Sequence, residues 1–262
     1  MHFRLITFIL PVVFFGLMTG VHAEEKLTAN QIVAACDKVR NPEKPFSFVE
    51  DLVVYKSNKP IKKMRLVVYA KEDEDSGQFR SLIRFLAPPR DKNKIMMKNG
   101  NVLWFHDPST KASVRISPKQ RLLGQASNGD IMSVNLAKDY EAEIGGQETI
   151  KDTKRKNRDC YKIDLSAINN SVTYDKIEFW IEKKTFIPIK GKFYSESGRL
   201  LKTAYYRNMK HHLGRKRPSE TIIIDGLDRK QITKITHKNY QFQTIPDSWF
   251  QKEYLPRFKG LN

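Results

Sequence analysis

The stretch that most constrains the fold of this chain is residues 79–139, where strand-like runs alternate with strong turn signals. The runs cover residues 79–86, 94–98, 102–106 and 112–117, and the signals between them are Pro88-Pro89, Asn99-Gly100 and Asp107-Pro108. Asn-Gly between two apolar runs is the strongest short-range hairpin signal, because a type I′ turn needs a positive φ at both central residues. The stretch therefore predicts an antiparallel meander, followed by a loop over 118–129 and a short helical run.

Alternation of apolar and polar residues continues on both sides of this stretch. It covers residues 46–54 and 64–70 before it and 161–165, 177–181, 187–193 and 201–206 after it, with 222–224 and 232–235 as further candidates. The chain has 262 residues, of which 40% are hydrophobic, so it can bury one sizeable core. Many strands joined by short turns predict a mainly β protein, built as a curved antiparallel sheet that closes on itself.

Helices are predicted only at a few places. Thr28 and Gln31 have the spacing of a capping box, and Ile32, Cys36 and Val39 then share one helix face that must pack on the sheet. Residues 246–255 predict a short helical run that caps an open end of the sheet.

The motifs of the central stretch carry a resemblance to a known family. They are F-L-A-P-P at 85–89, Met96-Met97, a hairpin with Trp104, Asp107-Pro108, Arg115-Ile116, L-L-G-Q-A-S-N-G-D at 122–130 and Asp139-Tyr140. In this order they resemble the periplasmic outer-membrane lipoprotein-sorting proteins, the LolA-like superfamily. The resemblance implies an open, incomplete antiparallel β-barrel, covered by helical lids and apolar on its concave side, and the strand-like runs predict about ten or eleven strands for it. Such a fold accounts for runs that are apolar on both faces, such as 102–105 and 177–181.

The first 23 residues have the pattern of a signal peptide. Arg4 precedes an apolar run over 5–18, and Val21 and Ala23 stand at the positions before a cut. We expect cleavage after Ala23, a periplasmic location and a single half-barrel domain over 24–262. An uncleaved membrane anchor is the alternative, which the short run containing Pro11 disfavours. The formal net charge of +18 favours anionic partners, and export excludes nucleic acid.

Two cysteines, Cys36 and Cys160, are far apart in the sequence. In an oxidising compartment they could form one disulfide, and the alternative is a pair of buried free thiols. The sequence leaves both open. No Cys-x-x-Cys or His-x-x-His accompanies them, so they do not indicate a metal site.

Catalytic chemistry is not indicated. The sequence has no nucleophile elbow, P-loop, H-E-x-x-H or zinc signature, and the histidines after residue 23 are scattered at His106, His211, His212 and His237. His106 next to Asp107 could orient as a base, but a satisfied structural histidine is favoured. We expect a protein that is not an enzyme and that uses neither a metal nor a cofactor. The glycine-containing loop at 122–130 is interpreted as a structural turn, in which Gly124 and Gly129 permit tight backbone and Asp130 caps the helical run.

Positive charge gathers in residues 211–218, where Arg215, Lys216 and Arg217 follow one another. Such a loop could contact anionic lipid headgroups or an acidic partner, each exposed cation contributing about 1 kcal/mol near an anionic membrane. A basic loop without a partner explains the same residues equally well.

Aromatic residues in the strands provide the main functional hypothesis. A half-open barrel could line a cleft for an acyl chain with them, although plain core packing explains any single one. The candidates are Phe79, Phe85, Trp104, Phe179, Phe193 and Tyr205. We expect a monomeric carrier that binds a lipid or lipoprotein acyl chain and transfers it between envelope partners. The resemblance adds an inner-membrane exporter as a partner; the alternative function is an accessory module that docks to such an exporter or to the envelope through its basic surface.

Overall fold

The computed structural model of the chain describes residues 26–260, so the predicted signal peptide lies outside the described residues. Helices are few in this range. They are α1 (Ala29–Arg40), α2 (Leu136–Asp139) and the 3-10 helices η1 (Pro89–Asp91), η2 (Asn128–Ile131), η3 (Asp247–Phe250) and η4 (Lys252–Arg257). None of the helices in residues 26–260 has the length and apolar character needed to span a membrane.

Strands make up more than half of residues 26–260. They are β1 (Phe46–Lys56), β2 (Lys59–Glu72), β3 (Phe79–Ala87), β4 (Ile95–Asn99), β5 (Val102–Asp107), β6 (Ala112–Ile116), β7 (Arg121–Leu123), β8 (Ala126–Ser127), β9 (Tyr140–Lys151), β10 (Asn157–Ala167), β11 (Lys176–Glu182), β12 (Pro188–Tyr194), β13 (Leu200–His212), β14 (Arg215–Asp225) and β15 (Gln231–Phe242). All except β7 and β8, which pair with each other, belong to one sheet.

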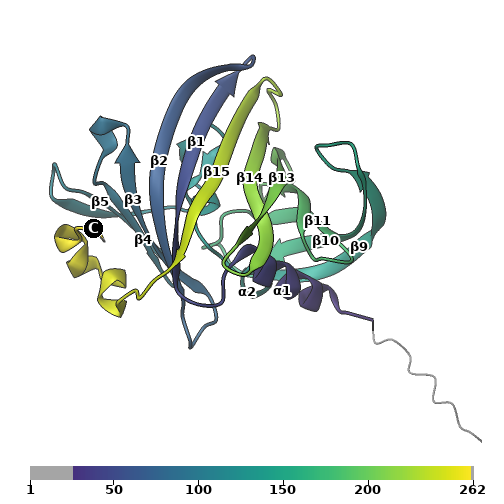
Figure 1. Cartoon of the computed structure of the whole chain (residues 1–262), viewed down its shortest axis with the longest axis horizontal. Coiled ribbons are helices and arrows are strands. Elements are labelled where there is room, and N and C mark those ends of the chain that lie inside the picture. The colour runs from purple at the N-terminus through teal and green to yellow at the C-terminus, as the bar shows by residue number, and fades with distance from the viewer. Residues whose placement is uncertain (1–25, 261–262) are drawn as a thin grey trace, which may run out of the picture.

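The large sheet is an antiparallel meander with one long-range joint. Its order is β6-β5-β4-β3-β2-β1-β15-β14-β13-β12-β11-β10-β9, so β1 pairs with β15 and joins the two halves of the chain. The sheet curves strongly but does not close, because β6 and β9 remain as free edges (Figure 1). The predicted hairpin at Asn99-Gly100 connects β4 to β5, with Gly100 at φ +55°.

The sheet has thirteen strands, more than the ten or eleven expected. The strand β9 is the one that the sequence pattern does not indicate. Its residues are mostly polar and exposed, and a bulge interrupts it where Lys162 and Ile163 of β10 face it, so no apolar alternation marks it. Both faces of β9 are mostly exposed, so its sequence needs no apolar alternation, and bulges and charges protect such free edges from unwanted pairing.

The concave face of the sheet carries the main apolar core. The β3 residues Ile83 and Phe85 and the β4 residue Met96 belong to this core, together with Ile32 and Cys36 of α1. The capping box of α1 forms as predicted: the Gln31 amide donates to Thr28 Oγ1 over 3.2 Å, and the Thr28 amide donates to Gln31 Oε1 over 2.8 Å.

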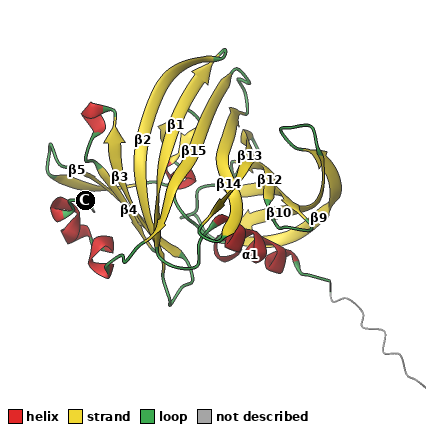
Figure 2. Ribbon diagram, in the orientation of Figure 1, coloured by secondary structure: helices red, strands yellow, loops and turns green. Residues whose placement is uncertain are grey.

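The convex face of β2 to β5 is covered by the C-terminal turns η3 and η4 (Figure 2). Trp249 packs edge-on against Tyr69 at 5.2 Å between ring centroids and against Phe258 at 4.7 Å. Alternate strand residues, Leu82 of β3 and Met97 of β4, complete this convex cluster. The C-terminal run therefore covers a face of the sheet and does not cap its open end, which is why the neighbouring strands are apolar on both sides.

The two cysteines are free thiols in this structure, and both are buried. Cys36 lies in the main core, whereas Cys160 lies in a third apolar cluster with Val39 and Trp180. Burial raises the pKa of the Cys36 thiol far above its ordinary value and that of Cys160 to about 12. Of the two alternatives left open by the sequence, the structure has the buried thiols.

Candidate ligand-binding cavity

A cavity of about 160 Å³ lies between the concave face of the sheet and two segments that cross over it. Its floor consists of strand residues from β1, β11, β12, β13, β14 and β15. The floor includes Phe46, Phe48, Glu50, Ile177, Phe193, Lys202, Ala204, Tyr206, Thr221, Ile223, Ile235, His237 and Tyr240. The opposite wall comes from residues 129–140 and 171–174, which we call the inner cover, and from Arg40 and Asn41 at the end of α1.

Hydrogen bonds to neighbouring backbone and side chains hold the inner cover in place. Asn41 Nδ2 donates to Val134 O over 2.9 Å, and the Ala137 amide donates to Asp37 Oδ2 over 2.9 Å. Asn135 is fixed at both ends, because its amide donates to Gln78 Oε1 over 2.8 Å and its side chain donates to Gly77 O over 2.7 Å. The cover is thus tied to α1 and to the turn between β2 and β3 by polar contacts, in addition to the apolar packing of Met132 and Leu136 in the main core.

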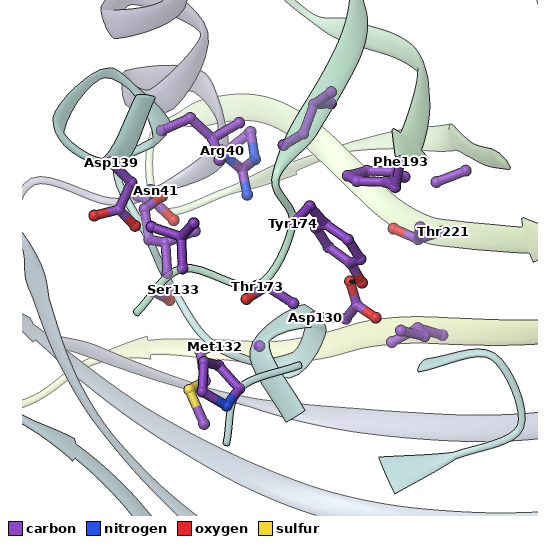
Figure 3. A pocket seen from close by; sticks show the side chains of 18 of the residues that line it. Arg40, Asn41, Asp130, Met132, Ser133, Asp139, Thr173, Tyr174, Phe193 and Thr221 are labelled. Atoms are coloured by element: carbon purple, nitrogen blue, oxygen red, sulfur yellow. Dashed lines mark hydrogen bonds between the residues drawn. The ribbon is translucent and has the colours of Figure 1, made fainter. Parts of the chain in front are cut away.

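A buried charged group ties the inner cover to the floor. Lys202 of β13 is 3% exposed, forms an ion pair with Asp130 of η2, and donates from Nζ to Gln125 O over 2.9 Å. The Tyr174 hydroxyl donates to Asp130 Oδ1 over 2.7 Å, and Lys202 Nζ lies 4.7 Å from the centre of the Tyr174 ring. Figure 3 shows Tyr174 pointing toward Asp130 across the cavity wall. Burial lowers the pKa of Lys202, while Asp130 acts to raise it.

A second charged pair stands at the end of α1. Arg40 Nη1 donates to Asp37 Oδ1 over 2.9 Å, and Figure 3 shows the Arg40 side chain reaching into the cavity. Burial raises the pKa of Asp37 to about 6, although Arg40 and the amide of Ala137 act to lower it. The carboxyl that anchors the cover therefore titrates nearer to neutrality than an ordinary aspartate.

Glu50 of β1 lines the floor and is 1% exposed. Its Oε1 lies 3.1 Å from His237 Nδ1, but its Oε2 has no hydrogen-bond partner among the described residues. Burial raises the pKa of Glu50, and the neighbouring His237 acts to lower it. An unpaired carboxylate oxygen at a cavity wall is costly for the protein alone and available to a ligand donor.

The six aromatic residues that were predicted to line a cleft do not lie together in the structure. Phe193 lines the cavity. Phe79, Phe85 and Phe179 are buried in the main core, in the same apolar cluster as the floor residues, but do not line the cavity. Trp104 lies on the convex face, where it packs against the convex cluster between Arg115 and Lys252, with Lys252 Nζ 4.5 Å from its ring.

Tyr205 is the sixth candidate and does not line the cavity either. It alternates along β13 with Ala204 and Tyr206, both of which do line it, so the strand turns Tyr205 to the other side. Trp104 faces away from the cavity for the same reason. Leu103 lies in the main core, so the next residue, Trp104, must face the opposite side of the sheet.

The predicted basic contact surface is also incomplete. Arg217 is 1% exposed and donates through Nε to His212 O over 3.1 Å and through Nη1 to Arg40 O over 3.3 Å. It is therefore a buried side chain that links β14 to α1, and not a surface cation. Arg215 forms an exposed ion pair with Glu43 at 2.9 Å, which leaves Lys216 as the unpaired member of the three.

Several cavity residues were not singled out by sequence reasoning. Phe46, Phe48 and Tyr240 stack in a row, with 4.9 Å between the rings of Phe48 and Tyr240. Their positions at alternate sites of β1 and β15 fit an apolar face, but nothing local says that β1 and β15 are neighbours. For Lys202 and Glu50 the sequence has only a weak signal of a functional site: each is a charged residue inside an apolar strand run.

The 122–130 loop has the structural role that its sequence indicates, with additions. A Cβ on Gly124 would stand 2.4 Å from Thr233 Oγ1, and Gly124 has φ +58°, so both space and conformation require glycine there. The Ser127 amide donates to Asp130 Oδ2 over 2.6 Å, so Asp130 caps η2 from inside the helix. Gly129 and Asp130 also line the cavity.

No group of three or more His, Cys, Asp or Glu side chains within residues 26–260 is placed to hold a metal ion. His106 is buried, and its Nδ1 lies 2.9 Å from Ser113 Oγ. It is therefore a satisfied histidine, as favoured from the sequence.

Known structures share this fold. The chain is similar to the crystal structure of a LolA superfamily protein from Nitrosomonas europaea, with a TM-score of 0.78 and 31% identity, over 87% of this chain and 100% of that chain. A DUF1329 family protein from Desulfovibrio piger has a TM-score of 0.72 and 18% identity, over 87% of this chain and 97% of its own. A Vibrio parahaemolyticus domain described as an outer membrane lipoprotein-sorting protein has a TM-score of 0.71 and 18% identity, over 87% and 98%.

The fold class is therefore the LolA-like open antiparallel sheet. A family model described as an uncharacterized protein matches residues 77–257, and no curated protein matches the sequence. Because that match covers more than half of the chain and the Nitrosomonas protein is 31% identical along its whole length, this chain belongs to the LolA superfamily. The resemblance seen in the central motifs is confirmed.

Proposed function

We propose that this protein is a periplasmic carrier that binds the acyl chain of a lipid or lipoprotein in the cavity and transfers it between envelope partners. The observation that carries the proposal is a hollow on the concave side of the sheet, roofed by a cover that polar contacts hold in place. Family membership supports it, as does the lipoprotein-sorting description of the Vibrio neighbour.

The size of the cavity defines how the carrier works. At about 160 Å³ it is comparable to a hollow that holds one benzene, whereas pockets for drug-sized ligands occupy roughly 300–1,000 Å³. The cavity is therefore too small for a whole acyl chain, which enters only when the inner cover moves. Moving the cover breaks hydrogen bonds around Asn135 and Asp37, whose lost partners water can replace, and also removes Met132 and Leu136 from the main core.

Binding and release then follow from burial. Each methylene that leaves water contributes about 0.8 kcal/mol, which offsets the cost of opening the cover. At the donor, the acyl chain displaces the inner cover. At the acceptor, a membrane or partner protein buries the acyl chain equally well, so the acyl chain leaves the cavity and the inner cover closes again. In this proposal no covalent bond is made or broken, and the protein acts without a catalytic residue, metal or cofactor.

The alternative, a module that docks to an exporter through its basic surface, has less support. A filled core would favour it, and the burial of Arg217 and the pairing of Arg215 with Glu43 weaken the surface on which it rests. An exporter as donor is compatible with the carrier and remains part of the proposal.

Filling the cavity tests the proposal. Ala204→Phe places a ring into the floor, whereas Thr203→Phe places the same ring on the opposite side of β13. Native mass spectrometry and lipid extraction of protein purified from the periplasm should find acyl species on the wild type and on Thr203→Phe and not on Ala204→Phe. A wild-type protein that carries no acyl species and takes up no fluorescent fatty acid would refute the carrier. Urea unfolding of the three proteins shows whether each is folded.

A further inference from the structure

Two hairpin turns stand side by side at the far end of the sheet from the inner cover. The turn between β1 and β2 and the turn between β14 and β15 meet where the Ser57 amide donates to Lys230 O over 3.1 Å (Figure 1). We call residues 56–63 and 226–230 the hairpin-tip surface. Phe46, Phe48 and Glu50 line the cavity from the opposite end of β1, so this surface lies away from the cavity.

Two large apolar side chains project from the hairpin-tip surface. Leu227 is 82% exposed and Ile61 is 54% exposed. The turn that carries Leu227 is well ordered: Asp225 Oδ1 accepts from the Leu227 amide over 2.7 Å and from the Asp228 amide over 2.8 Å. A Cβ on Gly226 would stand 2.3 Å from Leu200 O, so this turn is packed tightly against β13. Leu227 is therefore held outward by its turn.

Cations surround these two side chains. All of them are exposed, and none forms an ion pair with an acidic group among residues 26–260: Lys56, Lys59, Lys62, Lys63, Arg229 and Lys230. The acids of the same turn, Asp225 and Asp228, are occupied by backbone amides. The six cations outnumber these two carboxylates, so the hairpin-tip surface keeps a net positive charge.

We propose that the hairpin-tip surface docks onto a bilayer that contains anionic phospholipid. Exposed cations attract the protein to negatively charged headgroups, and each one near the surface strengthens binding roughly fivefold. Leu227 and Ile61 then enter the boundary between headgroups and acyl chains, as apolar residues of peripheral proteins do. The chemistry fits a membrane better than an acidic protein, because the apolar side chains project singly from turns and form no groove that would receive a partner.

Docking here keeps the cavity and its cover clear of the bilayer surface. The proposal does not depend on the carrier function, because a protein without cargo would dock equally well. It also differs from the basic segment at 211–218, where one of the arginines is buried and another is paired.

Vesicle flotation of the purified protein tests the proposal, with phosphatidylcholine alone or mixed with phosphatidylglycerol. The wild type should float with the mixed vesicles at low salt and not with phosphatidylcholine. Lys59→Glu/Lys62→Glu should weaken binding at least tenfold. The matched control is Lys210→Glu/Lys216→Glu on β13 and β14, which makes the same change in net charge at exposed sites and should alter binding less than twofold.

Leu227→Ser gives the second readout. It leaves the charge unchanged and should weaken binding severalfold at high salt, where screening removes most of the electrostatic attraction. Absence of wild-type binding to the anionic vesicles overturns the proposal. An equal loss in both double variants also overturns it, because binding would then depend on net charge and not on this surface. Lipid carriage is measured separately on the same variants, so a protein without cargo that still floats refutes the carrier alone.

Discussion

The two faces of the same sheet are completed in opposite ways. On the convex side of β2 to β5 the C-terminal turns pack apolar rings such as Trp249 and Phe258 against the strands, and the hollow beside Phe258 is lined in part by polar side chains such as Arg84 and His106. On the concave side the inner cover stands off the floor, and charged groups such as Lys202 and Glu50 are buried beside a cavity. The apolar packing around Trp249 contributes stability, whereas the buried charged groups beside the concave cavity give up part of it.

The largest expected effect is on the convex side. Trp249→Ala removes a ring that is 6% exposed and contacts Tyr69 and Phe258. We expect the free energy of unfolding to fall by about 4 kcal/mol, because a cavity replaces the indole. Urea unfolding measures it, and the folded fraction should retain its lipid. A loss below about 1 kcal/mol would mean that the C-terminal turns contribute little.

The next effect concerns the ion pair between Lys202 and Asp130, which links the floor of the cavity to the inner cover. Lys202→Met leaves the partly buried Asp130 without its cation, and we expect a loss of about 3 kcal/mol in the free energy of unfolding. Adding Asp130→Asn should restore part of this loss, since the uncompensated charge is removed. If the double variant is no more stable than the single one, the pair is not what holds the inner cover.

A smaller effect of opposite sign is expected on the floor. Because the pKa of Glu50 is raised by burial in the folded protein, ionising it costs stability as pH rises above its ordinary value. Glu50→Gln should therefore be more stable than the wild type by about 1 kcal/mol at about pH 8, and the difference should disappear near pH 4. The groups that face Glu50 are His237, which lowers its pKa, and Asp130, which raises it. A difference that does not depend on pH would contradict this account.

The smallest effect is chemical. Cys36 and Cys160 are free, buried and hard to ionise, so iodoacetamide should modify neither in the native protein. After unfolding without reductant, intact mass should show two added groups. A protein that takes up none after unfolding would contain the disulfide.

Local patterns predicted much of the fold and little of the cavity. The capping box at Thr28, the turn at Asn99-Gly100 and the alternation along most strands are short-range features, so the sequence alone indicated them. The polar edge strand β9 has no buried face and left no such pattern. The family motifs predicted the open sheet, because a resemblance to a family implies the architecture of the whole domain.

The site was harder because it depends on which strands meet. Phe193 was predicted and lines the cavity, but Phe48 and Tyr240 become neighbours only through the pairing of β1 with β15. Trp104 and Arg217 were placed on the wrong face or at the surface because alternation alone does not say which side of a sheet is covered. The convex cluster settles that question, and it is built by residues more than a hundred positions away.

Photo-crosslinking with a diazirine-bearing palmitate is the measurement that tests the difference between the two faces most directly. The carrier account predicts that, after irradiation, mass spectrometry finds the label on cavity residues such as Phe48, Tyr206 and Ile223, and that Ala204→Phe abolishes it while Thr203→Phe does not. Label confined to the convex residues around Trp249, or no label on a folded wild-type protein, would contradict it.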